Sequence, residues 1–190
     1  GRRGPDEGEL RTTLLRGSEV LNAIEGELAS ARGLWLTTWN LNLGPRLEAF
    51  LDRVQATDRL PVRLIFDDLA DSGLTSRGAE RLSRAGVEVR GHSSRPSPGR
   101  GAMHAKVAYL HREAEDLAIV GSANLTETAL GEAGNEEMAV CLQGAPGHPA
   151  LRGIRERLLD GWQDADEAVF VEDAASRRDR DPVSEIPIVE

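Results

Sequence analysis

The sequence predicts an α/β domain in which helices flank a mixed, largely parallel sheet. A chain of 190 residues with 39% hydrophobic and 29% charged residues is long enough, and apolar enough, for one domain with a real core. Short β-rich runs alternate with amphipathic stretches through its first half. This strand–helix–strand–helix–strand order favours parallel strands that are connected by helices packed on the sheet.

The elements of the first half follow from apolar spacing and from glycine and proline. Apolar residues at helical spacing predict a first helix over residues 14–31, which Gly33 ends. Three β-rich runs predict strands over residues 34–39, 61–66 and 87–90. The helices expected between them are one opened by Pro45, with Leu47, Phe50, Leu51 and Val54 on one face, and one over residues 76–85.

The second half begins with a loop over residues 91–101, which is rich in Ser, Pro, Gly and Arg. The elements predicted after it are a strand pair at 106–110 and 117–120, a helix or turn at 124–130, a buried strand at 137–142 and an amphipathic helix ending near Trp162. For the whole chain we expect an extension over residues 1–12, a domain over 13–171 and a flexible acidic tail over 172–190.

Charge and composition exclude several classes of protein. The net charge of −9 argues against a broad basic surface, which nucleic-acid binders often carry, although it leaves room for a local basic cleft. No apolar run approaches the roughly 20 residues of a membrane helix, and no signal peptide is recognisable, so we expect no stable membrane association. Cys141 is the only cysteine and lies in a strand-like apolar run, which indicates a buried thiol and a cytoplasmic protein.

One ordered set of polar residues carries chemistry. His104 and Lys106 form an H-x-K motif, Gly121-Ser122-Ala123-Asn124 follows, and Glu136 comes next, each beside an apolar run. Alternate residues of a strand face the same side, so His104 and Lys106 should project together. A neutral imidazole can attack a phosphate diester to give a phosphohistidine, while lysine and amide donors hold its non-bridging oxygens. A carboxylate can fix the imidazole tautomer, and this chemistry needs no metal and no cofactor.

This set of motifs resembles the signature of the phospholipase D superfamily. The resemblance extends from the first predicted helix to Trp162 and is strongest between Met103 and Val140. It implies a phospholipase D-like fold and a site made by His104 as nucleophile or acid, Lys106 and Asn124 as phosphate ligands, Ser122 as a supporting donor and Glu136 as the orienting carboxylate.

The chain departs from the family motif at one position and supplies only half of the motif pair. The family has an Asp five residues after the Lys, where this chain has His111, and Asp116 lies beyond the turn and is given no role. The family mechanism uses two histidines from two such motifs. The resemblance therefore implies a homodimer that shares one site across a twofold axis, or a partner that carries a second motif.

The function predicted from these residues is metal-independent phosphodiester hydrolysis, with DNA or another nucleic acid as the substrate. Small single-motif members of the family resemble nucleases, and no amphipathic stretch marks a membrane-binding surface. Two alternatives stay open. One is a phospholipid hydrolase or phosphatidyltransferase resembling cardiolipin synthase, and the other is a non-catalytic module of a defence or restriction system.

Several further residues have both a functional and a structural interpretation. Arg95 and Arg100 could contact a substrate phosphate, with Arg100 as the candidate for substrate binding, or they could be solvated loop charges, and His92 is equally ambiguous. Asp67, Asp68 and Asp71 fit a strand-to-helix turn better than a metal site, because no His or Cys accompanies them. Trp35 and Trp39 should share a strand face, where packing is favoured over base stacking.

Overall fold

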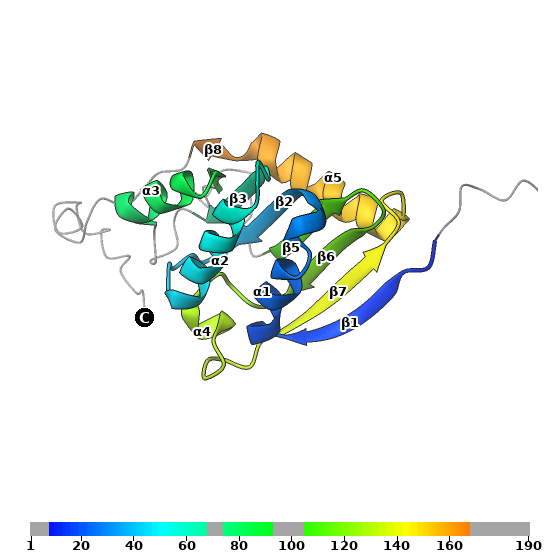
Figure 1. The fold of residues 1–190 in the computed structure, drawn as a ribbon, viewed down its shortest axis with the longest axis horizontal. Helices are drawn as coiled ribbons and strands as arrows, with labels where there is room; N and C mark the ends of the chain where they lie inside the picture. The colour runs from blue at the N-terminus through cyan, green and yellow to red at the C-terminus, as the bar shows by residue number, and fades with distance from the viewer. Residues whose placement is uncertain (1–7, 68–73, 93–104, 168–190) are drawn as a thin grey trace, which may run out of the picture.

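The protein is built on one eight-stranded sheet with helices on both of its faces (Figure 1). The computed structural model describes residues 8–67, 74–92 and 105–167. The strands are β1 (Arg11–Arg16), β2 (Ala31–Thr38), β3 (Val62–Asp67), β4 (Val87–His92), β5 (Lys106–Arg112), β6 (Asp116–Gly121), β7 (Met138–Gly144) and β8 (Asp166–Glu167). The α-helices are α1 (Gly17–Glu25), α2 (Pro45–Ala56), α3 (Ser76–Arg84), α4 (Glu127–Leu130) and α5 (Pro149–Asp164), and a 3-10 turn spans Leu28–Ser30.

The sheet is mixed, as expected, but antiparallel pairs outnumber parallel ones. The strand order is β1-β7-β6-β5-β2-β3-β4-β8. Among the described strands the parallel pairs are β2–β3 and β3–β4, and these are the pairs that the helical connections α2 and α3 require. The other five pairs are antiparallel because β5 and β6 are joined by a short turn, β7 returns along β6, and β1 and β8 add to the two edges. The prediction of a mixed sheet is therefore confirmed, but the sheet is largely antiparallel and not largely parallel.

The first predicted helix was too long at both ends. Leu14 lies in the edge strand β1, α1 begins only at Gly17, and Gly33 belongs to β2. The Arg16 N–H donates to the Glu19 carboxylate at 2.7 Å, which caps the true start of the helix. Pairing with β7 along its whole length gives β1 its extended form, although its own residues are mostly exposed and carry no strand-like alternation.

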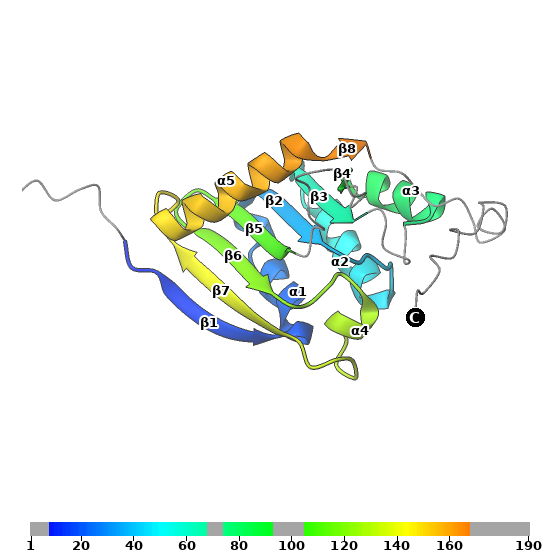
Figure 2. The same cartoon turned by 180° about the vertical axis from the view of Figure 1, so that it is seen from behind.

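Two apolar layers hold the helices to the sheet. On one face α1, α2 and α3 contribute Leu21, Ile24, Phe50, Leu51 and Leu82 to the main core, which confirms the apolar face predicted for α2. On the other face α5 is the described helix that covers the strands (Figure 2), and there Leu151 and Leu158 pack on Tyr109 and Ala118. Trp162 of α5 meets Trp35 edge-to-face, with ring centroids 5.7 Å apart, so Trp35 has the packing role that was expected.

The remaining predicted elements are confirmed within two or three residues of their ends. These are the strands over 34–39, 61–66, 87–90, 106–110, 117–120 and 137–142 and the helices α2, α3 and α5. Cys141 is buried in β7, as its apolar surroundings indicated. The acidic tail predicted over 172–190 lies outside the described residues. Among the helices that are described, none has both the length and the apolar character needed to cross a membrane.

Candidate active site

The candidate site forms where four strands end at the same edge of the sheet. Lys106 begins β5 opposite Gly121, the last residue of β6, and Gly121 lies opposite Ala139 near the start of β7. The end of β2 is antiparallel to β5 and completes the group. Antiparallel pairing thus brings Lys106, the Ser122–Asn124 segment and the residues before β7 together. His104 and Arg100 lie outside the described residues.

Lys106 supplies the positive charge of this edge. Its Nζ lies 5.7 Å from the centroid of the Trp39 ring, within the range of a cation–π contact. Partial burial lowers the pKa of Lys106 below its ordinary value, and the negative charge of Glu137 acts in the opposite direction. The ammonium is therefore partly desolvated beside one carboxylate, an arrangement in which it can hold a phosphate oxygen strongly.

Ser122 is tied to Glu137, the neighbour of the glutamate predicted from the sequence. The Ser122 hydroxyl donates to the Glu137 carboxylate and accepts the Met138 N–H at 3.3 Å, while the Ser122 N–H donates to the Met138 carbonyl at 3.1 Å. Glu136 is exposed and has no hydrogen bond or ion pair to any described residue. The structure therefore brings Glu137 to the site, whereas the orienting role proposed for Glu136 stays a prediction.

Strand alternation explains which glutamate faces the site. Ala139 and Cys141 of β7 point into the main core, and Glu137 shares their parity. Lys106 likewise shares the parity of Ala108 and Leu110, which are in the same core. Counting back by twos from the buried residues of β7 would have selected Glu137 from the sequence alone.

Asn124 is oriented by backbone and hydroxyl groups at the end of β2. Its Oδ1 accepts the Asn40 N–H at 3.1 Å and lies 3.3 Å from the Thr38 hydroxyl. Thr38 is fully buried and also accepts the Leu125 N–H at 3.0 Å, which pins the segment after Asn124. With its oxygen occupied in this way, the Asn124 amide presents its Nδ2 group as a donor, as a phosphate ligand must.

Gly121 is required by the closeness of β7. A Cβ built on Gly121 would lie 2.5 Å from the Met138 carbonyl oxygen and 2.6 Å from the Ala139 Cβ, so no larger residue fits without a shift of backbone. This contact sets the spacing between the two strands at the point where Ser122 and Glu137 meet. The glycine of the G-S-x-N motif therefore serves the geometry of the site.

A cavity of about 600 Å³ opens beside the same edge, between α5 and the sheet. Its walls are mostly apolar and include Thr37, Val107 and Val120 from the sheet and Ile154 and Leu158 from α5. Ala105, which follows His104 directly, lies on its wall together with two basic side chains, His92 and Arg157. The cavity thus adjoins the H-x-K motif.

The sequence contains three acidic residues, Asp67, Asp68 and Asp71, that were predicted to form a strand-to-helix turn and not a metal site. Asp67 ends β3 and is buried, and Asp68 and Asp71 lie outside the described residues. Within the described parts of the chain no three His, Cys, Asp or Glu side chains are grouped as metal ligands would be.

Comparison with known proteins identifies the family. The family model described as "Cardiolipin synthase, PLD-like domain" matches residues 34–157, which is more than half of the chain. The chain belongs to the phospholipase D superfamily. No curated protein sequence matches it.

Solved structures of the phospholipase D fold agree with this membership. NucT from Helicobacter pylori superposes with a TM-score of 0.64 at 15% identity, over 84% of this chain and 99% of NucT. Nuc from Salmonella typhimurium, a phospholipase D family member, gives a TM-score of 0.59 at 16% identity, over 84% and 97% of the two chains. Phosphatidylserine synthase from Haemophilus influenzae gives 0.54 at 14% identity, over 78% of this chain and 36% of the synthase. At these identities the likeness shows a shared fold.

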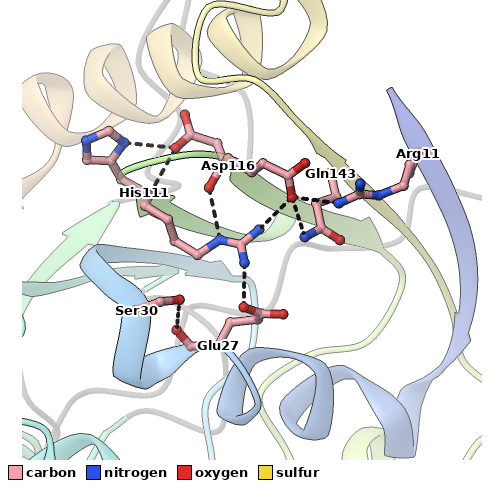
Figure 3. A network of polar contacts seen from close by, with 8 residues as sticks. Arg11, Glu27, Ser30, His111, Asp116 and Gln143 are labelled. Carbon is pink, nitrogen blue, oxygen red and sulfur yellow. Dashed lines mark hydrogen bonds and ion pairs between the residues drawn. The ribbon is translucent and has the colours of Figure 1, made fainter. Parts of the chain in front are cut away.

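His111, where the chain departs from the phospholipase D motif, lies at the other end of β5. It belongs to a polar network there (Figure 3). The His111 Nδ1 is 2.9 Å from Oδ1 of Asp116, which is fully buried and also accepts the Arg112 N–H at 3.1 Å and the Tyr109 hydroxyl at 2.5 Å. Arg112 continues the network to Glu27 through an ion pair. His111 lies five positions along β5 from Lys106, about 16 Å away. The network therefore ties the β5–β6 turn and takes no part in the candidate site.

Proposed function

We propose that the chain is a metal-independent phosphodiesterase that cleaves DNA or another nucleic acid through a phosphohistidine intermediate. One observation supports the proposal. Lys106, Asn124 and the Ser122–Glu137 pair lie at the same sheet edge. Lys106 is the second residue after His104. An ammonium and an amide donor suit the non-bridging oxygens of a phosphate diester, whose charge rises in the transition state.

The reaction proceeds in two displacements. The His104 imidazole attacks phosphorus, a P–N bond forms, and the P–O bond to the leaving alkoxide breaks. A second imidazole donates its proton to that alkoxide. Water then attacks the phosphohistidine and gives its proton to the second imidazole, the P–N bond breaks, and a phosphate monoester leaves.

A phospholipid substrate is the second candidate, because of the cavity beside Ala105. A mostly apolar cavity of about 600 Å³ is large enough for part of an acyl chain, and it adjoins the residue that separates His104 from Lys106. The fold shared with nearly the whole of Nuc and NucT supports a phospholipase D-like domain. The single buried thiol of Cys141 suits a cytoplasmic location.

Trapping the intermediate tests the chemistry and the substrate together. The protein is mixed in EDTA with a labelled DNA duplex, a labelled single strand or vesicles of labelled phospholipid, quenched in alkali, and mapped by mass spectrometry. The expected result is a nucleic-acid fragment joined through its phosphorus to His104, formed from nucleic acid only and absent from His104→Ala. Labelling from phospholipid alone would establish the second candidate, and normal turnover by His104→Ala would overturn the mechanism.

A further inference from the structure

The side of α5 that borders the cavity of about 600 Å³ is formed largely by small residues. It carries Ala150, Gly153 and Gly161 beside Ile154 and Arg157, at the spacing of three and four residues that marks one side of a helix. Glycine weakens a helix interior, so these glycines serve a purpose other than helix formation. A Cβ built on Gly153 meets no atom within 4 Å. The small residues therefore leave open the space between α5 and the sheet.

The cavity runs across the strands, from β4 at one end to β6 at the other. Its sheet wall takes residues from five neighbouring strands, which are His92 of β4, Ile65 of β3, Thr37 of β2, Val107 of β5 and Val120 of β6. Four strand spacings separate β4 from β6, which is about 19 Å. A cavity of this volume spread over that length is narrow, so it suits a chain better than a compact molecule.

The apolar wall continues beyond the cavity onto the open sheet. Val120 lies opposite Val140 of β7, and Val140 lies opposite Leu14 of β1. These three side chains are 39%, 36% and 62% exposed, respectively. Ile119 and Cys141, their neighbours in sequence, point into the main core on the opposite face, so the three lie on the face of α5. Contiguous exposed apolar side chains of this kind mark a binding surface.

Two polar side chains of the wall are available to a ligand. The Nδ1 atom of His92 is buried without a hydrogen-bond partner, and buried polar atoms rarely lack one. Arg157 forms no ion pair with any described residue. The Thr37 hydroxyl, in contrast, is occupied, because it donates to the Ala105 carbonyl at 3.1 Å and accepts the Val107 N–H at 3.0 Å.

We propose that this cavity binds a single-chain amphiphile with an anionic head, such as a fatty acid. Its carboxylate lies at Arg157 and His92, and its chain runs along the apolar wall toward Val120. A guanidinium and an imidazole form charge-assisted hydrogen bonds with a carboxylate. The described residues of the wall include no Asp or Glu, and Asp67, which lies opposite His92 in register, is not part of it. In a chain with a net charge of −9, such a wall favours an anion locally.

The amphiphile site is separate from the candidate active site. Alternation along β5 points Val107 toward α5 and points Lys106, with Ala108, toward the main core on the other face. The strand therefore stands between a molecule in the cavity and the Lys106 side chain. The inference goes beyond the proposed function. A fatty acid has no phosphate diester, so its binding does not depend on the proposed reaction.

Calorimetric titration of the wild-type protein with laurate, below the concentration at which it forms micelles, tests the proposal. We expect one laurate per chain. Decanoate, which is shorter by two CH₂ groups, should bind about 15-fold more weakly because its buried chain is shorter. Dodecyltrimethylammonium has a chain of the same length with a cationic head and should bind at least about tenfold more weakly than laurate. An absence of laurate binding, or equal affinity for the two heads, would overturn the proposal.

Substitutions in α5 locate the bound molecule. Gly153→Leu fills the open space and should weaken laurate binding at least about 100-fold. Leucine is a better helix former than glycine, so urea unfolding should show this variant to be as stable as the wild type or more so. Laurate binding at wild-type affinity to folded Gly153→Leu would place the ligand elsewhere and refute the inference.

A matched pair of arginines tests the position of the head. Arg157→Gln should weaken laurate binding about tenfold or more and leave the affinity for uncharged decanol unchanged. Arg152→Gln removes an exposed arginine of the same helix that is not on the wall, and it should leave both affinities unchanged. Equal losses of laurate affinity in the two variants would show that the carboxylate does not lie at Arg157.

Discussion

At the scale of single residues, Glu136 and Glu137 differ in what their carboxylates contact. Glu137 accepts the Ser122 hydroxyl and acts on the charge of Lys106, whereas Glu136 is exposed. We expect Glu137→Gln to lower kcat/KM for a chromogenic phosphate diester on the order of 100-fold, as the loss of a positioned proton-handling group does. Glu136→Gln is the matched comparison, and from the contacts of the two side chains the larger loss should fall on Glu137→Gln. Equal losses in the two variants would contradict the assignment to Glu137.

We expect Lys106 to set the alkaline limit of phosphate binding in the proposed reaction. Burial lowers its pKa, so the ammonium loses its proton as the pH rises through a value below that of a free lysine, and binding weakens in that range. The Glu137 carboxylate raises the same pKa, so Glu137→Gln should lower it further. The alkaline limb of a pH profile of KM should therefore move to lower pH in Glu137→Gln. A shift to higher pH would show that Glu137 does not act on the lysine charge.

At the scale of elements, the β5–β6 turn depends on one buried carboxylate. Asp116 accepts from the Arg112 N–H and the Tyr109 hydroxyl and lies beside His111, so Asp116→Ala leaves buried donors without an acceptor. We expect a loss of about 3 kcal/mol in the free energy of unfolding, measured with urea. Glu113→Ala, which removes only the exposed ion pair with Arg32, should cost less than about 1 kcal/mol. A loss below 1 kcal/mol for Asp116→Ala would show that the turn is held by other contacts.

The elements with clear internal patterns could be predicted from the sequence. Helix α2 is marked by Pro45 and an apolar face, and the parallel strands by continuous apolar runs. Strand β1 could not be predicted, because its exposed residues carry no alternation and only the pairing with β7 makes it extended. The antiparallel half of the sheet likewise depends on which strands meet in space.

The candidate site was predictable where motif residues adjoin buried strands. Lys106, Ser122 and Asn124 could be selected because each lies at the end of an apolar run. The support of Asn124 by Thr38 and Asn40 could not, because it joins residues more than 80 positions apart. Asp116 was set aside for its place beyond the turn, and only the folded chain shows that the turn returns its carboxylate to Tyr109 and His111.

At the scale of the whole molecule, a net charge of −9 limits how a nucleic acid can be held. For the proposed nucleic-acid substrate we therefore expect few phosphate contacts, so the salt dependence of binding should be shallow. With about two phosphates neutralised, raising salt from about 50 to 200 mM should lower the affinity for duplex DNA about tenfold, against about 10³-fold or more for six contacts. Fluorescence anisotropy with His104→Ala, which should bind without cleaving, measures this slope. A loss of 10³-fold would indicate an extensive basic groove that the net charge does not reveal.

The polar network around Asp116 lies far from the sheet edge that carries Lys106. This separation has a practical consequence. Stabilising substitutions often cost activity when they stiffen the reacting groups, but here the network and the chemistry occupy opposite ends of the same strands. The exposed turn at Glu113 and Ala114 is therefore a suitable place to insert a reporter peptide or attach a fluorophore. A label at that turn would report on the protein without touching Lys106, Ser122 or Asn124.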